Sequence, residues 1–145
     1  MSSIDRQKGE NMIDYKRLME KANDMRKMSY VPYSHFRVGA VLVTKDGKEY
    51  TGCNIENAAF SPTICAERTA FAKAVSEGER EFSCIAIVGG REGEISTLCA
   101  PCGVCRQVMS EFCDSNFEVV LGTPGKFKVF KLDEVMPFRF TGEEL

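Results

Sequence analysis

Residues 84–88, Cys-Ile-Ala-Ile-Val, form a continuous apolar run of strand length. Because a strand with one solvated face would alternate apolar and polar residues, this run predicts a strand buried on both faces. The segments 64–77 before it and 102–112 after it have helical composition, and a further apolar segment follows at 117–122. A strand, helix, strand succession implies a crossover connection, so we predict an α/β fold with a partly parallel sheet.

The first third of the chain supplies a helix and a hairpin. Residues 12–28 are predicted to be an amphipathic helix, since apolar residues recur at spacings of three and four. These residues are Tyr15, Leu18, Ala22 and Met25. Strands are predicted at 36–44 and 48–54, and Asp46-Gly47 between them favours a hairpin in which glycine accepts the positive φ of a tight primed turn.

The end of the chain completes the sheet. Strands are predicted at 117–122 and 126–132, and a short helical turn followed by coil at 133–145. We therefore expect a mixed five-stranded sheet with helices on both faces, formed by one domain over residues 12–145. The polar segment 1–11 is expected to be a flexible tail.

Charge and hydropathy argue against several classes of partner. The net charge is −2 and the sequence pI is about 5.5, so no overall basic field attracts nucleic acid or an anionic membrane. No apolar run reaches the roughly 18 residues of a membrane span. The N-terminus has no apolar segment typical of a secretion signal. We expect a cytoplasmic protein whose seven cysteines are thiols or metal ligands rather than disulfides.

Two short segments carry candidate chemistry at predicted helix N-termini. Cys65 and Glu67 begin one helix, and Cys102 and Cys105 begin the next. Free backbone N–H groups at a helix N-terminus stabilise thiolates. Three thiolates and a water would suit a catalytic zinc ion, with Glu67 reaching the water beyond the tip of the helix. Arg68 would offset the negative charge of such a site, unless it is only a surface charge on the helix.

Other interpretations of the cysteines stay open from the residues alone. Cys65 by itself would suit a buried small apolar residue, and Cys102 with Cys105 would suit a redox pair. A closed structural zinc site would take Cys99 as its fourth ligand. The other cysteines are predicted to be packing residues. They are Cys53, Cys84 and Cys113.

Four motifs together resemble one family. The segments CAERTA and PCGVCRQ resemble the zinc-dependent nucleoside deaminases. PYSHFRVGA and GCNIENA narrow the resemblance to cytidine deaminases of the short, typically homotetrameric type. The resemblance runs from about Tyr30 into the C-terminal tail. It implies a three-layer cytidine deaminase-like fold, one zinc ion per chain, and hydrolytic deamination of cytidine and deoxycytidine to uridine and deoxyuridine in pyrimidine salvage.

The resemblance also assigns roles to individual residues. It makes Cys65, Cys102 and Cys105 the zinc ligands, and Glu67 the group that moves protons as hydroxide attacks ring carbon 4. Arg68 lies beside the thiolates. The residues that correspond to substrate contacts are Phe36 on the base, Asn54 and Glu56 on the ribose, the Ala66 N–H on the base, and Phe140 in a neighbouring subunit's pocket.

The motif departs from the family at one position, and two alternatives to the implied function remain. Ala100 stands where the family usually has a serine before Pro-Cys-Gly, so a hydroxyl beside the site is missing. A deaminase acting on a blasticidin-type antibiotic or on a polynucleotide cytosine would share the metal motifs. A zinc scaffold without catalysis would share the cysteines alone.

Overall fold

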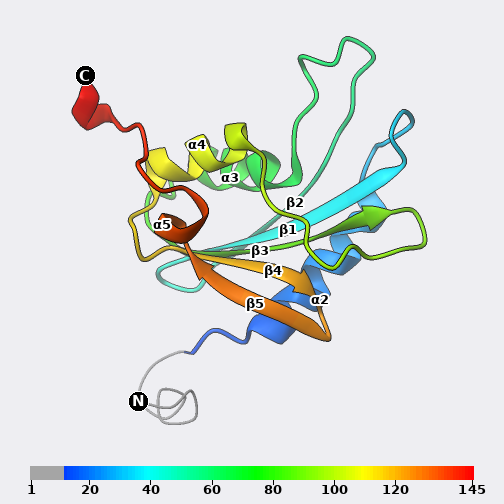
Figure 1. The fold of residues 1–145 in the computed structure, drawn as a ribbon, viewed down its shortest axis with the longest axis horizontal. Coiled ribbons are helices and arrows are strands. Elements are labelled where there is room, and N and C mark those ends of the chain that lie inside the picture. Colours follow the sequence, from blue (N-terminus) through cyan, green and yellow to red (C-terminus); the bar gives the residue numbers. More distant parts are fainter. Residues whose placement is uncertain (1–11) are drawn as a thin grey trace.

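The structure, a computed structural model, describes residues 12–145 and builds them around one mixed sheet (Figure 1). Its strands lie in the order β2-β1-β3-β4-β5. They are β1 (Phe36–Thr44), β2 (Glu49–Cys53), β3 (Phe82–Arg91), β4 (Glu118–Thr123) and β5 (Lys126–Lys131). β3 and β4 are parallel, whereas the other neighbouring strands are antiparallel. The prediction of a mixed five-stranded sheet is confirmed.

Helices cover both faces of this sheet, as expected (Figure 1). The helical segments are α2 (Tyr15–Met25), the 3₁₀ turn η1 (Arg26–Met28), α3 (Ala66–Ser76), α4 (Gly103–Phe112), α5 (Leu132–Val135) and the 3₁₀ turn η2 (Gly142–Glu144). α2 lies on one face, and α3 and α4 lie side by side on the other. Within residues 12–145, no helix has the length and apolar character needed to cross a membrane.

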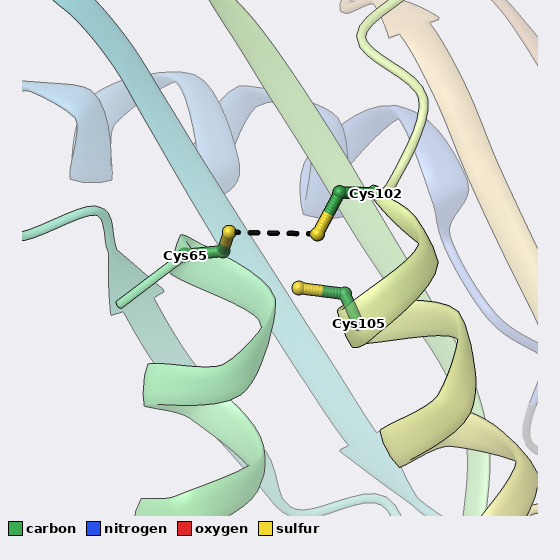
Figure 2. Close-up of side chains that lie close together, drawn as sticks. All are labelled: Cys65, Cys102 and Cys105. Atoms are coloured by element: carbon green, nitrogen blue, oxygen red, sulfur yellow. Dashed lines mark hydrogen bonds between the residues drawn. The ribbon is translucent and has the colours of Figure 1, made fainter. Parts of the chain in front are cut away.

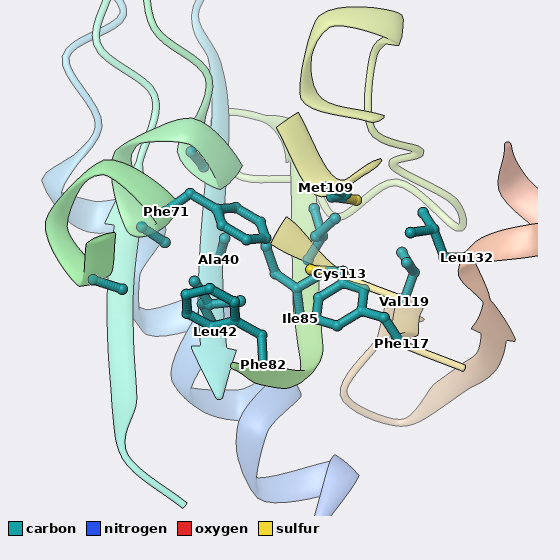
Figure 3. Packing of buried hydrophobic residues seen from close by; sticks show 14 of the residues in the cluster. Ala40, Leu42, Phe71, Phe82, Ile85, Met109, Cys113, Phe117, Val119 and Leu132 are labelled. Carbon is teal, nitrogen blue, oxygen red and sulfur yellow. The ribbon is translucent and has the colours of Figure 1, made fainter. Parts of the chain in front are cut away.

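The central strands are buried on both faces because their alternate residues enter two different cores. Leu42, Ile85 and Val119 belong to the cluster under α3 and α4 (Figure 3). Their sequence neighbours Val41, Ala86 and Val120 belong to the cluster under α2. The apolar run at 84–88 is therefore the middle strand of a three-layer structure, as its composition predicted.

Two glycines allow helices to lie directly on the sheet. A Cβ atom at Gly39 would be 1.9 Å from the carbonyl oxygen of Ala22 on α2. A Cβ atom at Gly52 would be 2.3 Å from the carbonyl oxygen of Ala66 on α3. Since no side chain fits at these distances, Gly52 fixes how closely the first turn of α3 approaches β2.

The β1–β2 hairpin forms, but the expected turn type is wrong. A type I′ turn needs positive φ at both central residues. Gly47 has φ 91°, but Asp46 is not among the residues with positive φ. Thr44 N–H donates to Lys48 O at 2.9 Å, which leaves a three-residue loop. Asp46 accepts a hydrogen bond from the Thr44 hydroxyl, and this bond stabilises the longer loop.

Several helix ends also differ from the predicted boundaries. α2 begins at Tyr15 rather than residue 12, because Asp14 caps it by accepting from Arg17 N–H at 3.1 Å. α3 begins at Ala66 rather than Ile64, because Ile64 pairs with Ile55 in an isolated β-bridge. The predicted tail at 1–11 lies outside the described residues.

Candidate metal and substrate site

Three cysteine sulfurs converge where α3 and α4 begin (Figure 2). Cys65 is the N-cap residue of α3 and Cys102 is the N-cap residue of α4. Cys105 follows within the first turn of α4. The three Sγ atoms lie within 4.8 Å of one another, with Cys65 and Cys102 3.8 Å apart. The sequence prediction placed both N-cap cysteines inside the helices, whereas each lies one step before its helix.

The N-cap position suits a metal ligand for two reasons. Both N-cap cysteines have extended backbone and neither side chain caps its own helix, so their sulfurs point toward each other instead. Both helix N-termini also bring partial positive charge to the cluster. Hydrogen bonds from Cys105, Arg68 and Cys102 lower the pKa of Cys65 to about 5, so this sulfur is a thiolate at neutral pH.

The chemistry of the donor set fits a zinc ion. Three thiolate sulfurs are soft ligands of the kind that zinc takes in proteins, and three protein ligands leave one position for water. Cys99 is not part of the cluster. Its sulfur instead packs against Gly89, where an added Cβ would lie 2.4 Å from it. A closed site with four cysteine ligands is therefore not assembled among residues 12–145.

Glu67 lies beside the sulfurs and is almost wholly buried, at 4% exposure. Cys105 Sγ lies 3.5 Å from Glu67 Oε2. Burial raises the pKa of Glu67 to about 7, and the negative charge on Cys65 adds to this shift. A carboxyl group with a pKa near neutrality both accepts and releases a proton readily, which is what a general acid–base group requires.

Arg68 brings positive charge to the same cluster. Its Nη2 donates to Thr63 O at 3.3 Å and lies 3.8 Å from Cys65 Sγ. Its Nε is buried and has no hydrogen-bond partner in residues 12–145. The guanidinium group therefore retains donor capacity beside the cysteine sulfurs.

The remaining four cysteines are buried, except Cys99, which is half-buried. Cys53, Cys84 and Cys113 are buried. Burial raises the pKa of Cys84 to about 12 and that of Cys99 to about 11. These thiols are protonated at neutral pH, and the structure places none of them in the three-sulfur cluster.

Asn54 and Glu56 hold the strands and loop beside the site. Asn54 Nδ2 donates to Phe36 O at 2.8 Å, and Asn54 Oδ1 accepts from Val38 N–H at 2.9 Å. Glu56 Oε1 accepts from the backbone N–H groups of Tyr33 and Ser34. A hydrogen bond from Ser34 keeps the pKa of Glu56 below its ordinary value, so this group is ionised.

The other three predicted substrate contacts lie in two places. Phe36 begins β1 and is half-buried, and Ala66 is the first residue of α3, directly after Cys65. Phe140 lies elsewhere, beside α4, where Gln107 Nε2 donates to its carbonyl at 2.9 Å. It lines a hollow of about 660 Å³ whose lining includes none of the other candidate site residues.

Sequence reasoning missed one residue next to the cluster. Arg106 follows Cys105 directly, and its Nε donates to Pro101 O at 2.8 Å. The motif PCGVCRQ contains this arginine, but nothing in the sequence indicates that its side chain reaches back past both cysteines.

Ala100, which stands where the family usually has a serine, lies on the surface, since this residue is exposed.

The fold and the cluster together are those expected of a metal-binding α/β enzyme. Residues 12–122 match the family described as cytidine and deoxycytidylate deaminase zinc-binding region. The chain is 46% identical over 134 residues to a cytidine deaminase of Sporosarcina psychrophila, covering 92% of this chain and 96% of the relative. The chain therefore belongs to the cytidine deaminase family of enzymes.

Two further comparisons bear on fold and substrate. The crystal structure of a cytidine deaminase from Burkholderia pseudomallei is similar with a TM-score of 0.79 and 45% identity, covering 89% of this chain and all of that one. This similarity confirms the cytidine deaminase-like fold. A blasticidin-S deaminase of Bacillus cereus is 30% identical over 128 residues, covering 86% of this chain and 90% of the relative.

Proposed function

We propose that this chain catalyses the zinc-dependent hydrolytic deamination of cytidine and deoxycytidine to uridine and deoxyuridine, with release of ammonia. The observation that carries the proposal is the approach of three cysteine sulfurs within 4.8 Å of one another, next to a buried glutamate. The similarity to proteins named cytidine deaminase supports the substrate class. One zinc ion per chain would be held by Cys65, Cys102 and Cys105.

The metal and Glu67 divide the chemistry between them. When bound, zinc supplies the Lewis acidity that lowers the pKa of a water molecule toward neutrality. Glu67 would take one proton from the water molecule that attacks carbon 4 of the cytosine ring and pass it to the ring nitrogen. It would then take the second proton of that water, from the new hydroxyl group on carbon 4, and pass it to the amino group, which leaves as ammonia. Its burial and its pKa of about 7 support this use as both base and acid.

The substrate would lie against β1 and the start of α3. Phe36 packs on the pyrimidine face, and the Ala66 N–H donates to the base. Asn54 Nδ2 has a second hydrogen beyond the one bonded to Phe36 O, and a carboxylate has more acceptor positions than the two N–H groups on Glu56 occupy. These remaining atoms are available for the sugar hydroxyls.

The substrate pocket would be shared between subunits of a homotetramer. Phe140 is 57% exposed, and the hollow that it lines contains none of the other candidate site residues of its own chain. Both observations support the proposal that Phe140 enters the pocket of a neighbouring subunit. A second hollow, of about 440 Å³, lies between α3 and α4 and is lined mainly by apolar side chains. This apolar lining supports contact with another subunit there. The enzyme would act in the cytoplasm in pyrimidine salvage, without nucleic-acid or membrane partners.

The direct test is incubation of the purified full chain with cytidine and with deoxycytidine. We expect ammonia release and the loss of the absorbance characteristic of cytidine. A zinc chelator should abolish both, and added zinc should restore them. Stoichiometric zinc without ammonia release from either nucleoside would overturn the enzyme proposal and favour a zinc scaffold.

A second candidate substrate is a blasticidin-type antibiotic, favoured by the 30% identity to a blasticidin-S deaminase. The residues Asn54 and Glu56 in the segment NIEN favour a nucleoside instead, because they suit ribose hydroxyls. Parallel measurement of kcat/KM on cytidine, blasticidin S and a cytosine-containing oligonucleotide decides between them. A higher value for either of the last two would overturn the proposed substrate.

A further inference from the structure

The side chain of Arg106 joins the start of α4 to the end of α5. Its Nε donates to Pro101 O at 2.8 Å, and its Nη1 donates to Val135 O. Pro101 is buried, whereas Arg106 is half-buried. Val135 is the last residue of α5, where a carbonyl has no partner within its own helix. One guanidinium group therefore satisfies two carbonyl oxygens that are 34 residues apart in the chain.

Arg106 also holds the backbone on both sides of Cys102. Its backbone N–H donates to Cys102 O at 3.0 Å, and its side chain donates to the carbonyl directly before Cys102. Cys102 is an exposed N-cap residue, and residues 92–102 before α4 contain no helix or strand. On the N-terminal side of Cys102, the Arg106 side chain therefore supplies the hydrogen bond to the neighbouring carbonyl.

We propose that Arg106 is a positioning residue for the metal site, and that it makes the geometry of Cys102 depend on the docking of α5. The proposal rests on the proposed zinc site and deepens it. Cys65 needs no such support, because the first turn of α3 is held against β2 in two ways. Gly52 lets the two backbones approach closely, and Thr69 Oγ1 donates to Cys53 O at 3.0 Å. Groups that orient metal ligands typically change metal affinity by about 10- to 100-fold when they are lost.

A second arginine provides a matched control. Arg139 also ties the C-terminal segment to α4, but at the opposite end of the helix. It donates to Cys113 O at 3.2 Å and to Ser115 Oγ at 3.1 Å. Its Nη2 also lies 3.8 Å from Asp133 Oδ1 on α5. Loss of Arg139 therefore loosens the same C-terminal segment but leaves both Arg106 side-chain hydrogen bonds in place.

The experiment titrates the metal-free full chain with Co²⁺ and follows the visible absorption of the cobalt–thiolate site, with Zn²⁺ competition giving the zinc affinity. Arg106→Met is expected to weaken Zn²⁺ binding by about 10- to 100-fold and to alter the cobalt spectrum. Arg139→Met should stay within about twofold of the parent chain. Denaturant unfolding of the metal-free variants measures their free energy of unfolding, which we expect to be lower than that of the parent in both.

Equal zinc affinity in Arg106→Met and the parent would overturn the proposal, as would equal weakening in Arg139→Met. If Arg106→Met does not fold, Arg106→Lys is tested instead. Its single ammonium group cannot reproduce the two hydrogen bonds of the guanidinium group to Pro101 O and Val135 O. We then expect at least about threefold weaker Zn²⁺ binding, and parent-like affinity would overturn the proposal. A parent chain that binds neither metal would instead overturn the zinc site itself, and this inference with it.

Discussion

Cys65 and Cys102 occupy the same position in two different helices, and their sulfur atoms lie 3.8 Å apart. An N-cap side chain ordinarily accepts a hydrogen bond from the first turn of its own helix. Here neither cysteine does so, and each sulfur points toward the other helix. The two helix N-termini therefore direct their partial positive charges at one cluster of thiols, which favours thiolates and hence a cation.

The cluster predicts which thiols a metal protects. In the metal-free protein, alkylation at pH 7.5 should label Cys102, which is exposed, and Cys65, whose pKa is about 5. Saturating zinc should protect both. Cys84 should stay unlabelled in either state, because it is buried and its pKa is about 12. Peptide mass spectrometry measures each site, and unfolded protein labelled at all seven cysteines is the control; labelling of Cys65 and Cys102 that zinc leaves unchanged would contradict the ligand set.

Glu67→Gln separates catalysis from metal binding. The amide keeps the size of the side chain but cannot carry the proton, so kcat should fall by about 10²- to 10⁴-fold while zinc content and the unfolding midpoint stay close to those of the parent. Steady-state deamination kinetics and metal analysis of the same preparation measure both quantities. Glu20→Gln, on the exposed side of α2, is the matched control and should be fully active. Parent-like turnover in Glu67→Gln would remove this residue from the mechanism.

The sequence predicted the sheet well because its signals were local. The apolar run at 84–88 needed two covering layers, and alternate residues of β3 do enter the two cores. The start of α3 depends instead on a contact that is not local. Ile64 pairs with Ile55 in a β-bridge. The helix therefore begins only at Ala66, and Cys65 becomes its N-cap residue.

The candidate site was predictable in its residue types but less so in its supporting contacts. The motifs predicted that Cys65, Cys102 and Cys105 form one site, and the structure places their sulfurs in one cluster. The same spacing carries no information on long-range backbone contacts. It therefore gave no sign that Arg106 bonds to Pro101 O and Val135 O, or that Arg26 is buried beside the end of β3, where it donates to Gly90 O at 3.1 Å.

Asn54→Ala should reduce recognition of the sugar specifically. If Asn54 binds a ribose hydroxyl, the ratio of kcat/KM for cytidine to that for 2′,3′-dideoxycytidine should fall by about 2- to 12-fold, since a hydrogen bond to the substrate is worth about 0.5–1.5 kcal/mol. Stability should fall as well, because Val38 N–H and Phe36 O lose their partner.

Ser29→Ala is the control for that stability loss. Ser29 Oγ donates to Val38 O at 3.2 Å, so this variant also loosens the start of β1, but it removes no proposed sugar contact. Its preference for cytidine over the dideoxy analogue should equal that of the parent. An unchanged ratio in Asn54→Ala would show that Asn54 acts on the strand alone.

Gly52→Ala should disturb the site through the backbone. A Cβ atom there would meet Ala66 O at 2.3 Å and Ala70 N at 2.7 Å, so the first turn of α3 must move away from β2. We expect the free energy of unfolding to fall by about 1–3 kcal/mol, together with weaker zinc binding. Gly103→Ala, next to Cys102 but with no atom within 4 Å of its added Cβ, should leave both quantities unchanged. Denaturant melts and zinc competition measure them, and a parent-like Gly52→Ala variant would refute the close-packing argument.

Met109 on α4 packs in the same core cluster as Val119, Leu121 and Leu132, all of which follow it in the chain. The helix that carries two of the three sulfurs packs on Phe71 of α3, which precedes it, but part of its core is completed only by these later residues. A chain emerging from the ribosome at about 5–20 residues per second exposes Cys65 for several seconds before a complete ligand set exists. All three sulfurs are thus synthesised before the last two strands of the sheet, so the cluster depends on packing that is completed after its final ligand.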